Sequence, residues 1–145
     1  MRPILFDAAS TVASAGAATE ARSAGRASAR AVHPCVVGTP GAELHPALAE
    51  YRFDAVFDKG EYAPAYSGFE GKDDGVGLAQ WLAAHDVTDV DVVGIATDYC
   101  VRATALDAAE HGLTTRVLLD LTAAVAPARV DQVVAEFDAA GIEVA

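Results

Sequence analysis

The sequence predicts an α/β protein, a three-layer arrangement in which helices cover both faces of a mostly parallel sheet. Apolar runs typical of buried strands occur at residues 3–7, 55–59, 89–95, 116–119 and 142–144. From residue 55 onward, segments with helical spacing separate these runs, and this alternation is typical of parallel strands joined by helical crossovers. The 145 residues suffice for one domain that buries roughly two thirds of its unfolded surface. We therefore expect a single domain over residues 1–145.

The first strand, at residues 3–7, ends in Asp7. Functional sites of parallel sheets lie at the carboxyl ends of the strands, which makes Asp7 a candidate site residue. The competing interpretation is that Asp7 caps a helix or turns the chain, which is the more frequent role of an isolated aspartate.

Residues 8–31 differ from the rest of the chain, because they are almost entirely Ala, Ser, Thr, Gly and Arg. Arg22, Arg26 and Arg30 would share one face of a helix, but the small residues opposite them bury little surface. We expect a poorly packed helix or disorder here. The strand-like start before this segment argues against a transit sequence.

The strand at 55–59 ends in Lys59 and is followed by a loop, residues 60–71, that contains three aromatic residues. Such loops near strand ends often line pockets, although most lysines are simply exposed. The remaining elements follow in order. A helix is indicated by Leu78, Trp81 and Leu82, a strand by residues 89–95, a helix from Cys100 to a C-cap at Gly112, a strand by 116–119, a helix by Val130, Val133, Val134 and Phe137, and an edge strand by 142–144.

Cys100 lies where the strand at 89–95 turns into a helix. A cysteine in the first helical turn sits among unpaired backbone N–H groups at the positive end of the helix dipole, which stabilises a thiolate. The same N–H groups can receive an oxyanion when the thiolate attacks a carbonyl. The alternative is that Cys100 is a small buried hydrophobic residue.

The composition excludes several classes of function. The net charge of −11 argues against nucleic acid and anionic membrane partners, which need a basic face. No apolar run has membrane-spanning length and no signal core is present, so we expect a cytoplasmic protein. The two cysteines, Cys35 and Cys100, are too few for a disulfide scaffold, although a bridge between them stays open.

Three segments together resemble bacterial nicotinamidases (pyrazinamidases) of the isochorismatase-like cysteine hydrolase superfamily. These are residues 94–102 (GIATDYCVR), Lys59 with Gly60, and residues 65–71 (AYSGFEG). The resemblance runs from about Cys35 to the C-terminus. It implies the isochorismatase-like fold, with one N-terminal strand lacking in this chain.

The resemblance implies a catalytic triad of Cys100, Lys59 and Asp7. Cys100 would attack the amide carbon of nicotinamide, Lys59 would hold the thiolate, and Asp7 would carry the proton to departing ammonia. The backbone N–H groups of Ala96 and Cys100 would form the oxyanion hole, next to a cis peptide at Ile95–Ala96. Tyr66 and Tyr99 would flank the pyridine ring, with Ile95 also in contact with substrate.

Family members also carry a divalent metal (Zn, Fe or Mn). In this chain only His33 lies near a family ligand position, one residue early because Pro34 intervenes. One histidine does not hold a divalent ion, so we expect no intact metal site and interpret His33 as a loop residue.

The leading hypothesis is an amidohydrolase of NAD metabolism (pyridine nucleotide salvage) that converts nicotinamide to nicotinate and ammonia through a Cys100 thioester. One alternative is an impaired remnant, folded as a homo-oligomer that covers the sheet edge exposed by the missing strand and at most binding small ligands. Another is an amidase for a different small amide. Vinyl ether hydrolysis of the isochorismatase type is disfavoured, because it does not need the thiol.

Overall fold

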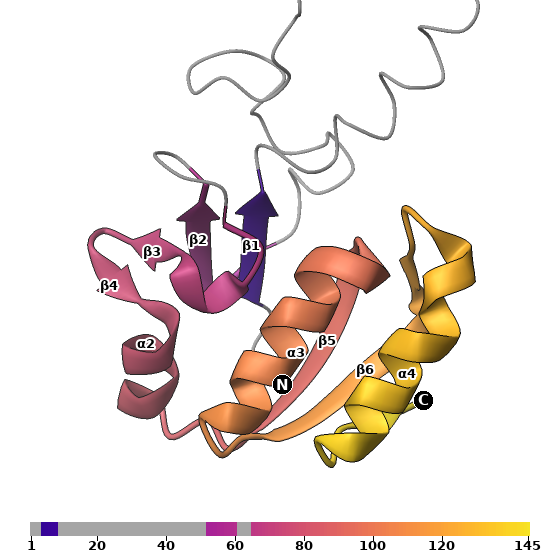
Figure 1. Cartoon of the computed structure of the whole chain (residues 1–145). Coiled ribbons are helices and arrows are strands. Elements are labelled where there is room, and N and C mark those ends of the chain that lie inside the picture. Colours follow the sequence, from indigo (N-terminus) through magenta and orange to yellow (C-terminus); the bar gives the residue numbers. More distant parts are fainter. Residues whose placement is uncertain (1–3, 9–51, 61–64) are drawn as a thin grey trace, which may run out of the picture.

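The computed structural model describes residues 4–8, 52–60 and 65–145 (Figure 1). Five described strands take part in parallel pairs: β1 (Ile4–Ala8), β2 (Ala55–Lys59), β5 (Asp89–Ile95), β6 (Thr114–Ala123) and β7 (Glu143–Val144). The helices are α2 (Leu78–Ala84), α3 (Arg102–Glu110) and α4 (Val130–Ala139). Shorter elements are η3 (Gly68–Glu70), the hairpin strands β3 (Lys72–Asp73) and β4 (Val76–Gly77), η4 (Thr97–Val101) and η5 (Pro127–Arg129).

The described strands form two sheets. In one, β1 pairs with β2 in parallel and β2 continues into the antiparallel hairpin β3–β4; in the other, β5, β6 and β7 are all parallel. The α/β class is confirmed, but the single sheet expected from the sequence is divided among the described residues. A ladder requires backbones about 4.8 Å apart, and no ladder joins β5 to β1 or β2 in this part of the chain.

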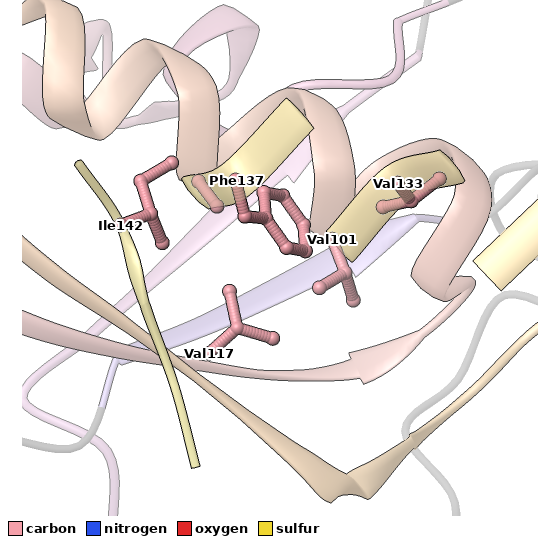
Figure 2. Close-up of a cluster of buried hydrophobic side chains, with 6 residues drawn as sticks. Val101, Val117, Val133, Phe137 and Ile142 are labelled. Carbon is pink, nitrogen blue, oxygen red and sulfur yellow. The ribbon is translucent and has the colours of Figure 1, made fainter. Parts of the chain in front are cut away.

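Helices α3 and α4 pack on one face of β6. Figure 2 shows Phe137 and Val133 of α4 directed toward Val101 and Val117, with Ile142 beside them. These side chains have helical spacing on α4 and alternate with exposed residues on β6, so each element buries the face that its sequence pattern predicts. A second core joins β2 to α2 through Phe57, Leu78 and Leu82.

The opposite face of β5 and β6 carries an ion pair. The Arg116 guanidinium donates two hydrogen bonds to the Asp91 carboxylate, at 2.8 and 2.9 Å. These bonds hold the pKa of Asp91 below its usual value and raise that of Arg116. Because Asp91 and Arg116 are direct partners in the parallel ladder, the pair links the two strands.

Most predicted element boundaries hold. Strands at 55–59 and 89–95 are as expected, and β6 is longer than the predicted 116–119. The polar stretch after Gly71 forms the β3–β4 hairpin, because Gly75 supplies a positive φ of 84° for the turn. The segment 9–31, Cys35 and His33 lie outside the described residues. The longest described helix, α4, has 10 residues and is too short to cross a bilayer.

Candidate active site

Cys100 lies in a helical turn that follows the carboxyl end of β5. The register of β5 against β6 shifts between Val92 and Gly94, and Gly94 has a positive φ of 109°, so the strand leaves its regular path there. The Ile95–Ala96 peptide bond is cis, as the family resemblance implies. The chain then forms the π-helical turn η4 and continues without a break into α3. A π-helical turn is uncommon and is frequently found at functional sites.

Lys59, at the carboxyl end of β2, reaches this turn. Its Nζ lies 3.5 Å from the Sγ of Cys100 and also donates to the carbonyl of Ala65 at 3.1 Å. Lys59 is 4% exposed and Cys100 is 6% exposed, so the contact is shielded from water. An ammonium donor in a dry setting stabilises a thiolate more strongly than the same group in solvent.

The segment that directly follows Tyr66 is held by hydrogen bonds and by close packing. Ser67 and Glu70 form a capping box on η3, and the N–H of Gly68 donates to Thr104 Oγ1 of α3 at 2.8 Å. Gly71 is closely packed, since a Cβ there would lie 3.2 Å from backbone oxygens of Asp58 and Gly68. The aromatic loop is thus attached to the helix that begins just after Cys100.

Tyr66 and Tyr99 lie next to each other, with ring centroids 5.7 Å apart and planes inclined by 33°. Tyr66 is 50% exposed, and the guanidinium carbon of Arg129 lies 5.4 Å from the centre of the Tyr99 ring. A pyridine ring stacked between the two tyrosine rings would need them about 7 Å apart, given contact distances of about 3.5 Å. Their centroids are closer than that, at 5.7 Å. The two tyrosines therefore present a joint surface here. Ile95 is 49% exposed at the end of β5.

Asp7 is placed by its backbone alone. In the parallel ladder of β1 and β2, Asp7 is the partner of Asp58, and Ala8 is the partner of Lys59. Asp7 therefore lies one register position away from Lys59, near the carboxyl ends of the two parallel strands. Its role in a triad stays a prediction.

Ala96, one of the two predicted oxyanion donors, directly precedes the turn that carries Cys100. Ala96 is fully buried directly before η4, and its carbonyl accepts the N–H groups of Tyr99 and Val101 at 3.1 and 3.0 Å. These bonds hold the turn so that the first N–H groups of the helix lie near Cys100. The assignment of Ala96 and Cys100 as oxyanion donors stays a prediction.

The residues in the described ranges do not fit a metal centre, since no three His, Cys, Asp or Glu side chains gather there. His33, the one residue that the sequence placed near a family ligand position, lies outside those ranges. A cavity of about 730 Å³ occurs elsewhere, along β5 and α2, with Leu78, Val90 and Ala108 among its lining residues. Neither Cys100 nor Lys59 is part of that lining.

Three residues next to the site escaped the sequence analysis. Asp98 is 2% exposed and accepts the N–H groups of Val125 and Ala126, which lie 27 and 28 residues along the chain. Arg129 and Thr104 likewise contact residues far away in the sequence: Arg129 lies over the ring of Tyr99, and Thr104 accepts the N–H of Gly68. No local pattern marks any of the three, whereas the capping box could have been found from the spacing of Ser67 and Glu70.

The chain matches a protein-family model, the isochorismatase domain, over residues 9–145. This match begins earlier than the resemblance inferred from the sequence, which starts at about Cys35, and it includes most of residues 8–31. Among characterised relatives, the nicotinamidase/pyrazinamidase of Mycobacterium tuberculosis is 61% identical over 92 residues, which are 63% of this chain and 50% of that protein. The chain thus spans about half the length of this relative.

Solved structures share the fold. PnC1 from L. infantum, in complex with nicotinate, has a TM-score of 0.70 and 40% identity over 78% of this chain and 59% of its own. The pyrazinamidase of Pyrococcus horikoshii, in complex with zinc, has a TM-score of 0.65 and 38% identity over 77% of this chain and 60% of its own.

Proposed function

The chain belongs to the isochorismatase domain family, and on this premise we propose that it hydrolyses nicotinamide to nicotinate and ammonia. The single observation that supports this most is the contact between Lys59 Nζ and Cys100 Sγ, 3.5 Å apart in a dry setting. The identity to the mycobacterial nicotinamidase/pyrazinamidase supports the substrate class. Such a reaction would serve pyridine nucleotide salvage, in the cytoplasm.

In the proposed reaction, Cys100 Sγ attacks the amide carbon and the carbonyl oxygen takes the negative charge. The N–H groups of Ala96 and Cys100 receive that charge, and Lys59 holds the sulfur anion before the attack. The carbon–nitrogen bond then breaks, the nitrogen takes a proton and ammonia leaves. Water attacks the thioester carbon, nicotinate forms and the thiol is restored.

We assign the proton transfers to Asp7, which would take the thiol proton and give it to the amide nitrogen. The support is its register position beside the strand end that carries Lys59. Tyr66 and Tyr99, whose rings touch each other, would form one wall against which the pyridine ring packs, with Ile95 at its margin.

No step of this proposal uses a metal, since the described donors do not fit one. We further propose that residues 1–145 act as one isochorismatase-like domain with a small amide as its ligand. A homo-oligomer stays a prediction, which sedimentation of the purified protein would test.

The test is to incubate the purified chain with nicotinamide and to measure ammonia and nicotinate. We expect release by the parent protein and none by Cys100→Ala. Release that persists in Cys100→Ala would refute the nucleophile. A parent that releases no ammonia, and whose Cys100 is alkylated no faster than cysteine in a peptide, would refute the hydrolase and favour the impaired remnant.

A further inference from the structure

The turn that carries Cys100 is attached to a segment far along the chain, residues 125–129. Asp98 Oδ1 accepts the N–H of Val125 at 2.9 Å, and Asp98 Oδ2 accepts the N–H of Ala126 at 3.1 Å. The segment is itself closed by a hydrogen bond from the N–H of Arg129 to the carbonyl of Ala126, at 2.9 Å. Arg129 then returns over the ring of Tyr99. Both residues that precede Cys100 are therefore held by the same segment.

A buried carboxylate is expensive unless donors satisfy both of its oxygens. Asp98 is 2% exposed, and here two consecutive backbone N–H groups satisfy one oxygen each. The proposed reaction gives Asp98 no role in bond making. The burial of Asp98 therefore needs another explanation. Asp98 lies in the five-residue turn Thr97–Val101, two residues before Cys100, so its hydrogen bonds act on the turn that carries the nucleophile.

We propose that Asp98 is a positioning residue for the nucleophile. By binding Val125 and Ala126 it fixes the turn so that Cys100 Sγ stays within reach of Lys59 Nζ, at the observed 3.5 Å. Thr97 supplies a second anchor, because its hydroxyl donates a 2.8 Å hydrogen bond to the hydroxyl of Thr122 near the end of β6. For its kinetic readout the inference rests on the proposed nicotinamide hydrolysis.

The decisive variant is Asp98→Asn, which has nearly the same shape. An amide has one acceptor oxygen, so one of the two N–H groups would face an NH₂ donor and lose its partner. Asp120→Asn is the matched control, because Asp120 is exposed and the same charge is removed. Circular dichroism of each variant establishes that it is folded.

Two readouts separate positioning from a general structural role. In Asp98→Asn we expect kcat for nicotinamide to fall about tenfold to a hundredfold, with KM changed by less than about threefold. We expect alkylation of Cys100 by iodoacetamide at pH 7, followed by mass spectrometry of its peptide, to slow by about tenfold. Asp120→Asn should match the parent in both. A folded Asp98→Asn protein with parental kcat and alkylation would overturn the inference.

The alkylation readout needs no substrate. If the parent did not hydrolyse nicotinamide, the proposed function would fail while the alkylation comparison still decided the role of Asp98. If Asp98→Asn did not fold, hydrogen exchange in the parent would decide instead. We expect alkylation of Cys100 to change the exchange rates of the Val125 and Ala126 amides, and unchanged rates would overturn the coupling.

Discussion

Lys59 and Cys100 are 41 residues apart in the chain, yet the Nζ of one lies 3.5 Å from the Sγ of the other. Neither side chain is more than 6% exposed. An ammonium within hydrogen-bond distance of a sulfur, away from water, stabilises negative charge that develops on that sulfur. The reactivity of Cys100 should therefore depend on Lys59.

We expect Lys59→Met to slow alkylation of Cys100 by iodoacetamide at pH 7 by about tenfold, because the thiolate loses its counter-charge. The measurement is the rate of modification of the Cys100 peptide. Lys72→Met is the control, since Lys72 is an exposed lysine on β3. Equal rates in the parent and in Lys59→Met would contradict an ammonium–thiolate pair.

Removing the hydroxyl of Thr104 should loosen the aromatic loop. In Thr104→Val the N–H of Gly68 loses its buried acceptor, which should lower the free energy of unfolding by about 1–3 kcal/mol. We expect KM for nicotinamide to rise more than kcat falls, because Tyr66 lies in that loop. Thr104→Ser keeps the hydroxyl and should behave like the parent; an equal defect in both variants would point to packing instead.

Phe137 anchors the core between α4 and β6 and is fully buried. Phe137→Ala should lower the free energy of unfolding by about 3–5 kcal/mol, because it leaves a cavity among Val101, Val117 and Ile142. Urea unfolding followed by circular dichroism measures this loss. Asp138→Ala, at the exposed neighbouring position, should change stability by less than about 0.5 kcal/mol. Similar losses in both would refute the packing shown in Figure 2.

The ion pair of Asp91 and Arg116 should make stability depend on pH in the acid range. The hydrogen bond from Arg116 holds the pKa of Asp91 below its unfolded value, so the unfolded chain binds more protons as the pH falls. The pair's contribution is therefore complete above about pH 5, and it disappears as the pH falls below about 4, through the folded pKa.

We expect Asp91→Asn to lower the thermal midpoint at pH 7 and to lower it by less, relative to the parent, at pH 3. Arg116→Gln removes the other partner and should reproduce this pattern. A difference from the parent that is the same at both pH values would show that packing, and not the charge pair, is responsible.

Treatment with EDTA should leave the proposed hydrolysis unchanged. The described residues offer no cluster of three metal-binding side chains, and the sequence places only His33 near a family ligand position. The measurement is ammonia release before and after chelation, together with metal content by mass spectrometry. Activity that chelation abolishes and Zn²⁺ restores would show that residues outside the described ranges complete a metal site.

Much of this protein could be predicted from local sequence. The strands β2 and β5 were predicted by apolar runs of strand length, and α4 by the spacing of Val133 and Phe137, because burial on one face leaves a period in the chain. The hairpin at Gly75 was not found, because strands of two residues are too short to show a period.

The sequence by itself determined the α/β class, the family, the strand end that carries Lys59 and the strand-to-helix turn that carries Cys100. Short-range periodicity and contiguous motifs contain that information. Only the tertiary structure decided that Lys59 contacts Cys100, that the strands divide into two sheets, and that Asp98 binds Val125 and Ala126. The contacts of Lys59 and of Asp98 join residues 27 to 41 positions apart. Such partners, like the division into two sheets, depend on how the elements pack, and no local pattern in the sequence records that.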